Sequence, residues 1–505
     1  MKTIKKDGQN KTPYIEAYLK YLHEKNTAFD VPGHHQGKIK TDLDRIFGHK
    51  LYASDVNAPR GMDNLAHPKG AIKEAEELWA KACGAKEAKF LVNGSTSGNL
   101  IMLMSTLSDK DKIILPRNVH KSVISGLILS GAIPIFVMPE MDTNTEIVMQ
   151  PSFDTWKKAI DDNPDAKAIF VINPTYFGAT TNLKKLVNYA HKHGVIVLVD
   201  EAHGSHFYFS KHLPCSAMEA GADMATLSIH KTGGSLTQSS VLLINTDAVS
   251  EYDIQKTCNI ITTTSPSSIL LASLDAARKY LVFKGSGRLI HAKQYAKDCI
   301  DRVNKIKGFK AHGKDYFVKV GAYNYDETKV VIETDKLSLT GFEVYKLLKD
   351  KYRVQVELAE TYVLLLLFTI GSEAKDVDII VKALTKIGEK YYDPNITYPD
   401  HHYLKEFAPM KMRPRDAYNS DLKVVHLNKA LNRVSKEAIM IYPPGIPVII
   451  PGEVFTKEVI EQLYYYKKIH AQILSDYEAS MLVSTVLEEN DRKPKKKKIE
   501  LPINK

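Results

Sequence analysis

Cysteine is scarce in this chain. Four cysteines occur in 505 residues, far apart and without a Cys-x-x-Cys pair, so the sequence indicates neither a zinc motif nor a disulfide framework. A reducing compartment fits this usage. Long apolar runs are also lacking. The most apolar stretch, Tyr362–Gly371, is about half the ~20 residues that a membrane span needs, so we expect a buried strand there.

The sequence also lacks the signals of a secreted protein, a repeat protein and a nucleotide-binding protein. No long apolar run follows the lysines of the first 22 residues, which argues against a signal peptide and favours the cytoplasm. The chain has no internal repeat. It contains neither a phosphate-loop lysine motif nor a Gly-x-Gly-x-x-Gly motif at its glycine-bearing loop, which disfavours nucleotide binding.

The charge is uneven along the chain. Net charge is +10, and residues 492–505 hold seven basic residues against one acidic residue. A basic run at a terminus is typical of a solvated tail, and this one lacks the interleaved aromatic residues that stack on bases. We therefore expect no nucleic-acid partner and no membrane partner.

The pattern of apolar segments predicts an α/β protein with five segments. These are an N-terminal arm (1–60), a large domain (61–289), a small α+β domain (290–390), a linker with a C-terminal module (391–491) and the basic tail (492–505). In the large domain, near-continuous apolar strands alternate with helical stretches. Such strands predict a mainly parallel sheet covered on both faces.

Polar loops follow five of these strands: NGSTSGN, RNVH, PTYFG, EAHG and HK. Ligands of open α/β sheets bind outside the carboxyl ends of strands, so this edge is the candidate site. In the first loop, Ser95 and Thr96 precede an apolar helix. They suit a phosphate at the helix start, or alternatively an ordinary helix cap.

Three single residues complete the pattern. Asp200 ends a buried strand, where a carboxylate is costly unless a cation meets it; the alternative is a helix cap. Lys231 lies between an apolar strand and Thr-Gly-Gly, an unusual setting for a lysine that serves only solubility. His120 follows another strand, and taken alone it would be interpreted as a core histidine.

Together these residues match the needs of pyridoxal 5'-phosphate. Lys231 would hold the cofactor as a Schiff base, Asp200 would keep the pyridine nitrogen protonated, and His120 would stack on the ring. Ser228 and His230, which adjoin Lys231, would contact the phosphate. The two glycines after the lysine would let the backbone close around the bound cofactor.

At this point the sequence resembles a known family, the bacterial ornithine, lysine and arginine decarboxylases of fold-type I. The matching stretches include PGHHQG, HPKGAI, FLVNGSTSGN, LPRNVHKSV, INPTYFG, VDEAHGSHF, SIHKTGGSLTQSS, TTTSPS, APMKMRPRDAY and YPPGIPVIIPGE.

The resemblance implies the same roles for Lys231, Asp200 and His120, and phosphate contacts for Ser95, Thr96, Ser228 and His230. It places His203 beside the cofactor. It also implies that Thr263 reaches the phosphate of a neighbouring subunit, hence at least a dimer. Larger members carry an N-terminal wing domain, for which no room exists before Phe90, so a homodimer or tetramer is expected.

The sequence therefore predicts a lyase, a decarboxylase of a basic amino acid. Arginine is the first choice, giving agmatine and carbon dioxide for polyamine biosynthesis; lysine and then ornithine are the alternatives. Glu357 is a candidate acceptor for a guanidinium fork, with Glu360 close by, although both can also be surface charges on a strand edge. The alternative hypotheses are an aminotransferase, an enzyme that catalyses another fold-type I reaction, and a non-catalytic regulator. No metal site is expected.

Overall fold

The computed structural model describes residues 6–143, 145, 147–396, 406–442, 446–469, 471–477, 481–488 and 491. The predicted basic tail, 492–505, lies outside the described residues. The chain divides into two compact units, Met1–Asp400 and His401–Lys505. All residues predicted for the site belong to the first unit. The finer division into five segments stays a prediction.

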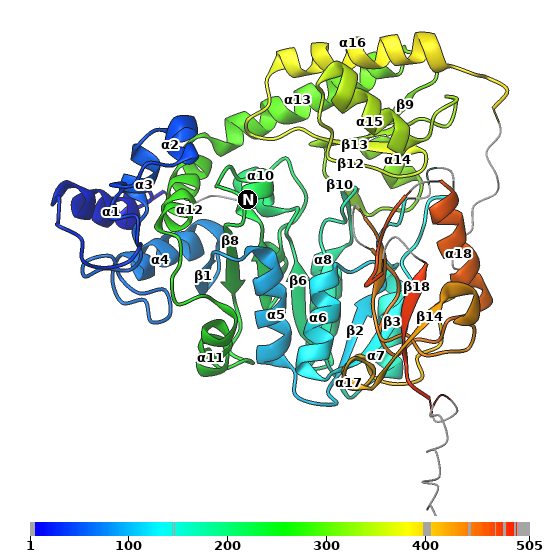
Figure 1. Ribbon diagram of the computed structural model, residues 1–505, viewed down its shortest axis with the longest axis horizontal. Coiled ribbons are helices and arrows are strands. Elements are labelled where there is room, and N and C mark those ends of the chain that lie inside the picture. Colours follow the sequence, from blue (N-terminus) through cyan, green and yellow to red (C-terminus); the bar gives the residue numbers. More distant parts are fainter. Residues whose placement is uncertain are drawn as a thin grey trace, which may run out of the picture. The chain divides into compact units, whose positions relative to one another are not determined.

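A seven-stranded sheet is the centre of the first unit (Figure 1). Its strands, in spatial order, are β1 (Glu87–Leu91), β8 (Ser240–Ile244), β7 (Met224–Leu227), β6 (Ile196–Asp200), β4 (Ala166–Ile172), β2 (Lys112–Pro116) and β3 (Ile133–Val137). Within this described sheet only β8 runs against the others, because it pairs antiparallel with both β1 and β7. The prediction of a mainly parallel sheet is confirmed.

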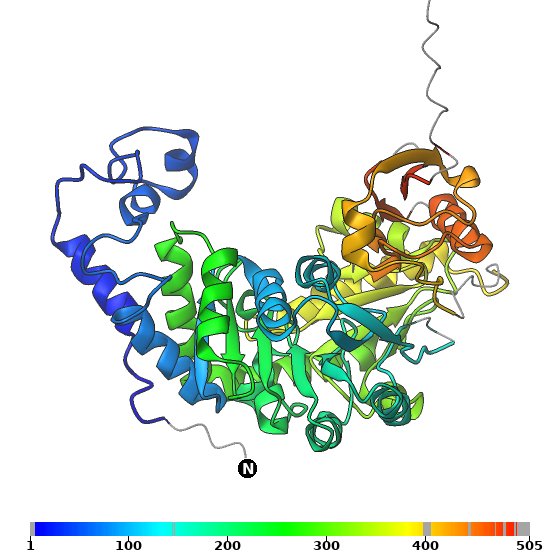
Figure 2. The same cartoon turned by 90° about the horizontal axis from the view of Figure 1, so that it is seen from below.

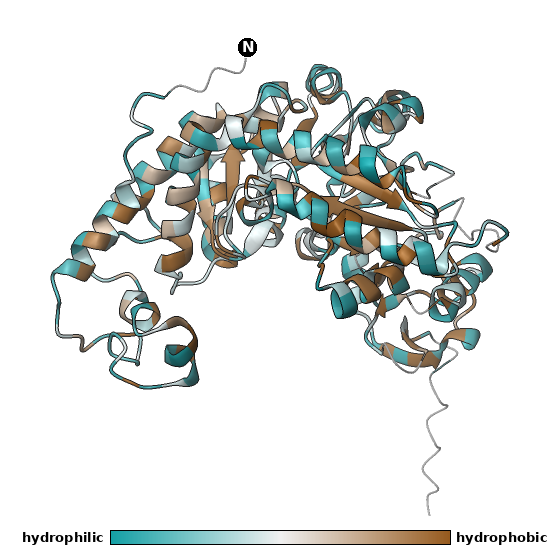
Figure 3. Ribbon diagram, turned by 90° about the horizontal axis from the view of Figure 1, so that it is seen from above, coloured by the Kyte–Doolittle hydropathy of each residue, from teal (hydrophilic) through white to brown (hydrophobic). Residues whose placement is uncertain are grey.

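Burial explains the apolar character of these strands. Every residue of β6, β7 and β8 is buried, so both sheet faces must be covered. Helices α5 (Gly94–Thr106) and α6 (Lys121–Ser130) pack together on one face. Helices α7 (Phe153–Asp162) and α8 (Leu183–Lys192) lie on the other, as Figure 2 shows. In Figure 3 the strands are brown and the outward helix surfaces largely teal.

A second, smaller sheet follows in the same unit. Its order is β12 (Leu358–Ala359), β13 (Val363–Leu367), β11 (Lys329–Glu333) and β9 (Lys310–His312), all antiparallel. Helices α13 (Ser286–Val303), α15 (Gly341–Tyr352) and α16 (Ala374–Tyr391) accompany it. A two-stranded pairing of β5 (Ala179–Thr180) with β10 (Asn324–Tyr325) joins the loop after β4 to this region.

The second unit contains two small sheets. β14 (Leu422–His426) pairs with β18 (Leu482–Val486), and β15 (Ile439–Tyr442) lies between β16 (Ile446–Ile449) and β17 (Gln472–Leu474). Its helices are α17 (Pro414–Asn419) and α18 (Lys457–Lys468). The remaining helices, all in the first unit, are α1 (Pro13–His23), α2 (Asp42–Phe47), α3 (Lys50–Ser54), α4 (Ala71–Cys83), α9 (Ala217–Ala220), α10 (Ile229–Thr232), α11 (Glu251–Ile261), α12 (Ser268–Tyr280) and α14 (Lys314–Lys319). Nowhere in the described chain is a helix long and apolar enough to cross a bilayer.

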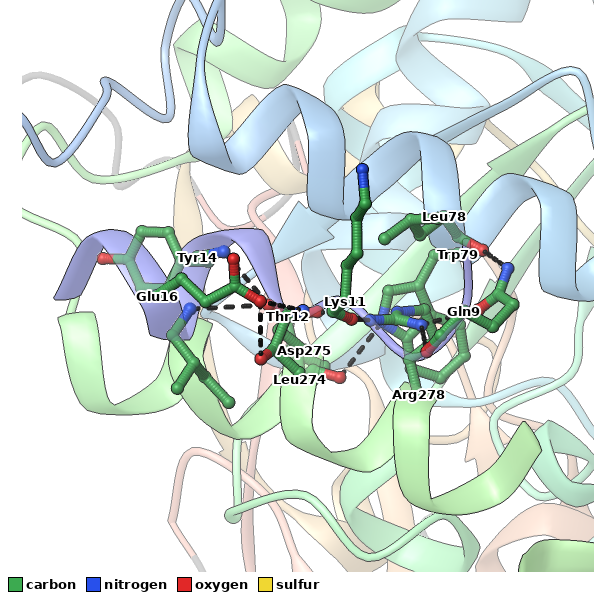
Figure 4. A network of polar contacts seen from close by, with 11 residues as sticks. Gln9, Lys11, Thr12, Tyr14, Glu16, Leu78, Trp79, Leu274, Asp275 and Arg278 are labelled. Atoms are coloured by element: carbon green, nitrogen blue, oxygen red, sulfur yellow. Dashed lines mark hydrogen bonds and ion pairs between the residues drawn. The ribbon is translucent and has the colours of Figure 1, made fainter. Parts of the chain in front are cut away.

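A buried ion pair attaches the N-terminal segment to α12 (Figure 4). Asp275 and Arg278 are completely buried, with 2.9 Å between Oδ1 and Nη2. The second carboxylate oxygen of Asp275 accepts a hydrogen bond from Tyr14 N, and Arg278 donates to the backbone oxygen and the side chain of Gln9. The arginine thus serves two segments that are far apart in the sequence.

Replacing Arg278 with methionine should destabilise the protein markedly. Asp275 would remain buried without its cation, a situation that costs about 3–5 kcal/mol. Thermal melting followed by circular dichroism measures the effect. Lys158→Met is the matched control, because it breaks an exposed ion pair with Asp162 that is worth about 1 kcal/mol or less. Equal melting temperatures for the two variants would contradict a stabilising role for the buried pair.

Candidate active site

Lys231 stands at the centre of the candidate site, on a single helical turn. The sequence placed it at the end of a strand, but β7 stops at Leu227 and α10 begins at Ile229. The turn closes through hydrogen bonds from Lys231 N to Ser228 O and from Gly233 N to Ile229 O. Gly234 has φ +84, a conformation that favours glycine, and a Cβ there would lie 2.9 Å from Ile370 Cδ1.

The amine of Lys231 contacts an imidazole. Its Nζ lies 2.9 Å from Nε2 of His203 and 5.7 Å from the ring centroid of Tyr176. Burial lowers the pKa of Lys231, while the carboxylates of Asp200 and Glu357 oppose the shift. A lysine with a lowered pKa has a larger fraction of neutral, nucleophilic amine at neutral pH.

Asp200 ends β6 as predicted and is 7% exposed. Its carboxylate accepts hydrogen bonds from Asn99 Nδ2 at 2.8 Å and from Ala202 N at 3.0 Å. Asn99 also donates to Ser122 Oγ, which fixes its amide. Among the described residues no lysine, arginine or histidine forms an ion pair with Asp200. The site therefore holds a buried carboxylate that suits a cationic partner.

His120 interacts electrostatically with both Asp200 and Lys231. It precedes α6, and its Nδ1 accepts a hydrogen bond from Ser122 N at 3.2 Å, so it also caps that helix. Burial lowers the pKa of His120; Asp200 opposes this shift and Lys231 adds to it. The lowered pKa favours the neutral form of the imidazole.

Two hydroxyls meet where α5 begins. Ser95 Oγ lies 2.7 Å from Ser228 Oγ, and both residues are buried. Thr96 follows Ser95 in the first turn of α5 and is exposed. His230 Nδ1 faces the carbonyl oxygen of Ser239 at 2.9 Å, and burial lowers its pKa. The structure thus brings two of the predicted anion contacts together at a helix start, where backbone N–H groups are unpaired.

Thr263 is placed differently. It is exposed in the loop between α11 and α12, where its Oγ1 accepts a hydrogen bond from Ser265 N at 3.1 Å. No described contact links Thr263 to Lys231 or Ser95 in the same chain. This position neither tests nor contradicts a role in a neighbouring subunit.

Glu357, the residue predicted for substrate binding, is close to Lys231. Tyr176 donates from its hydroxyl to Glu357 Oε1 at 2.7 Å, and Glu357 acts electrostatically on both Lys231 and Lys329. Its side chain is exposed, which leaves it open to a ligand. Glu360 differs, because burial raises its pKa to about 8. Glu360 is therefore largely protonated at neutral pH.

Three residues near Lys231 and Asp200 were not predicted from the sequence: Asn99, Tyr176 and Lys329. Asn99 and Tyr176 lie in the loops NGSTSGN and PTYFG. Both loops were predicted to line the site, but these two residues were not assigned a role. Lys329 gave none, because a lysine before an apolar strand is ordinarily a surface residue.

A cavity of about 520 Å³ adjoins Lys231. It lies between α10, α12 and the residues Thr369–Gly371 that follow β13, within the first unit. This volume is in the range of small-molecule sites. In the described part of the chain, no group of three or more His, Cys, Asp or Glu side chains could hold a metal ion.

The fold is shared with known enzymes. The constitutive lysine decarboxylase of E. coli superposes with a TM-score of 0.81 at 21% identity, over 95% of this chain and 82% of that one. Serine palmitoyltransferase of Sphingomonas wittichii superposes with a TM-score of 0.55 at 16% identity, over 76% and 85%. The fold is therefore fold-type I, as predicted.

The sequence comparisons identify the family. Residues 12–376 match the major domain, and residues 399–473 the C-terminal domain, of the Orn/Lys/Arg decarboxylases. An arginine decarboxylase of Bacillus subtilis (strain 168) is 40% identical over 466 residues, 92% of this chain and 95% of that protein. Another, from Halalkalibacterium halodurans, is 40% identical over 451 residues, 89% and 92%. The chain belongs to the Orn/Lys/Arg decarboxylase family, so the prediction of an amino-acid decarboxylase is confirmed.

Proposed function

We propose that the chain decarboxylates L-arginine to agmatine and carbon dioxide, with pyridoxal 5'-phosphate as cofactor. One observation carries the proposal: a desolvated lysine amine and a buried carboxylate that forms no ion pair with any described residue occur together at the carboxyl edge of the sheet. The names of the two Bacillus-type relatives support arginine as the substrate.

The donor set fits the cofactor at each of its ends. Asp200 lacks a cation, and a protonated ring nitrogen would supply one. Ser95, in the first turn of α5, and Ser228, which precedes α10, suit a phosphate. When bound, the cofactor supplies an electron sink for the bond that breaks at Cα.

The side chains then have distinct tasks. Lys231 would hold the cofactor covalently through its amine. Asp200, oriented by Asn99, would keep a proton on the ring nitrogen, and His120 would cover one face of the ring. In the reaction the bond from Cα to the carboxylate breaks, carbon dioxide leaves, and a proton takes its place on Cα.

A substrate panel tests the proposal directly. Purified full-length protein with added cofactor is incubated with arginine, lysine or ornithine, and carbon dioxide and the product amine are measured. Agmatine from arginine is the expected main product. A preference for lysine would overturn the choice of substrate and leave the decarboxylase intact. Release of a keto acid without carbon dioxide would instead indicate an aminotransferase.

Glu357 is our candidate for binding the far end of arginine. A guanidinium matches a carboxylate that accepts two parallel hydrogen bonds, whereas an ammonium needs only a point charge. The Tyr176 hydroxyl occupies one oxygen of Glu357 at 2.7 Å and fixes the orientation of the group. The position of Glu357, exposed yet within electrostatic range of Lys231, supports this role.

Glu357→Gln should raise KM for arginine by about 10- to 100-fold, because a hydrogen bond to a charged group contributes about 1.5–3 kcal/mol. The absorption of the bound cofactor should not change. Glu360→Gln is the matched control: the raised pKa of Glu360 means that this acid is largely neutral at neutral pH, as glutamine is. Steady-state kinetics with both variants separates the two roles. Similar KM values in the parent and Glu357→Gln would remove Glu357 from the site.

We also propose that the protein acts as a homodimer or a larger homo-oligomer. The N-terminal arm exposes large apolar side chains, among them Phe29 at 92% and Phe47 at 63%. Exposed apolar groups of this size favour association. Thr263, remote from its own site, would then serve the neighbouring one. Sedimentation velocity of the purified protein measures the assembly, and a monomer at micromolar concentration would contradict it.

A further inference from the structure

Lys329 is a second buried lysine beside the site, and neither the motifs nor the proposed reaction uses it. It opens β11 and is 1% exposed. Its Nζ donates to the carbonyl oxygen of Tyr176 at 2.7 Å and lies 3.4 Å from Nδ1 of His203. The opposite nitrogen of that imidazole, Nε2, lies 2.9 Å from Nζ of Lys231. His203 thus stands between two lysine amines.

The surroundings are shaped around the stem of this lysine. Gly178, in the PTYFG loop, has φ +108, and a Cβ there would lie 3.0 Å from both Lys329 Cδ and Tyr325 Cε2. Only glycine suits this position, because the backbone conformation is strained for other residues and the space is taken. The centroid of the Tyr176 ring lies 5.9 Å from Lys329 Nζ and 5.7 Å from Lys231 Nζ.

The charges that face Lys329 come from several elements. Burial lowers its pKa to about 8; Asp326 and Glu357 oppose this shift and Lys231 adds to it. Asp326 is itself buried against His206, 3.1 Å from its Nε2, and against Thr328. At pH values below about 8, Lys329 is therefore mainly an ammonium, which can donate hydrogen bonds but cannot accept them.

His203 is neutral under the same conditions. Burial lowers its pKa well below the ordinary value, and the positive charges of Lys231 and Lys329 add to the effect. A neutral imidazole carries one proton, on the nitrogen that does not accept a hydrogen bond. Lys329 can only donate, so Nδ1 of His203 accepts; the imidazole proton then stands on Nε2 when the Lys231 amine is neutral and can accept it.

We propose that Lys329 is a positioning residue that acts through His203. By donating to Nδ1, it keeps the imidazole proton on Nε2, where it faces the amine of Lys231. A donor at that place stabilises the neutral form of the Lys231 amine, which has a lone pair to accept it. The inference deepens the proposed function, because Lys231 is the residue that would hold the cofactor.

The test measures the protonation of Lys231 in the full-length chain freed of cofactor. Trace labelling with acetic anhydride between pH 6 and 11, read by peptide mass spectrometry, gives the pKa of the Lys231 amine in each variant. Lys329→Met keeps most of the apolar stem and removes the charge and the donors. We expect the pKa of Lys231 to rise by about one unit, with about tenfold less neutral amine near neutral pH. Lys293→Met, which removes a lysine paired with Glu327 in the turn between β10 and β11, should leave it unchanged.

Three outcomes would overturn the inference. These are an unchanged pKa of Lys231 in a folded Lys329→Met, an equal rise in Lys293→Met, or an ordinary lysine pKa for Lys231 in the parent. Should the methionine variant fail to fold, Lys329→Gln retains a donor for Tyr176 O and Nδ1. In Lys329→Gln the pKa of Lys231 should therefore stay close to its value in the parent protein. A full return to the ordinary lysine pKa would contradict the role. Because decarboxylation is not measured, this result and the failure of the proposed function are independent.

Discussion

Replacing Lys231 with alanine should reduce decarboxylation to background and leave the cofactor only loosely bound. This amine follows a strand of the seven-stranded sheet, has a pKa lowered by desolvation and contacts His203. Without it no covalent link to the cofactor can form, and the remaining contacts hold the phosphate and the ring nitrogen alone.

Two measurements check this expectation. Carbon dioxide release gives turnover, and dialysis followed by absorption spectroscopy gives the retained cofactor. In the parent, borohydride treatment and mass spectrometry should find the pyridoxyl group on the peptide that contains Lys231. Lys297→Ala, an exposed lysine on α13, serves as the control and should behave as the parent. Turnover near the parent rate in Lys231→Ala would refute the assignment.

Asp200→Asn should retain cofactor but lower kcat at least about 100-fold, equivalent to about 2.7 kcal/mol in the barrier. An amide of the same shape can still accept a hydrogen bond, but it cannot stabilise a positive ring nitrogen. The electron sink is weakened as a result. The absence of any described cation at Asp200 makes this carboxylate available for that purpose.

Asp223→Asn is the matched control, because Asp223 is also 7% exposed but serves the sheet. Its Oδ2 accepts from Val197 N at 2.8 Å and contacts His191. We expect this variant to melt at a lower temperature with an unchanged kcat, and Asp200→Asn to show the reverse. If Asp200→Asn lost only stability, Asp200 would be a structural cap like Asp223.

Most elements of the large domain could be predicted, because burial of both sheet faces imposes apolar runs on the strands. The five strands predicted before the polar loops all occur, as β1, β2, β4, β6 and β7. The antiparallel direction of β8 could not be predicted, since direction leaves no mark in a fully buried strand.

The strand expected around Glu357 and Glu360, at residues 354–360, is wrong over most of its length. The alternation of Val354, Val356 and Leu358 favours a strand, but only Leu358–Ala359 forms β12. Arg353 ends α15 in a left-handed conformation, with φ 55, and Val354 N then donates back to Leu348 O. The end of the helix therefore uses the backbone N–H of Val354, which a strand starting there would need for pairing.

The site was predictable where one residue type at one strand end carries the chemistry, as at Asp200 and Lys231. It was not predictable where contacts join distant segments. Lys329 meets His203 across 126 positions of sequence, and Asn99 meets Asp200 across 101. Neither pairing has a local pattern, because each depends on how separate elements pack.

The separation between the two sheets has a consequence for altering the enzyme in the laboratory. Asp200 ends a strand of the seven-stranded sheet and Lys231 lies on α10, which follows another strand of it, whereas Glu357 precedes a strand of the four-stranded sheet. Mutant libraries confined to residues 354–360 can therefore explore other amino-acid side chains while the bond-breaking apparatus stays intact. Variants from such a library should therefore differ in which amino acid they bind, while kcat stays near that of the parent enzyme.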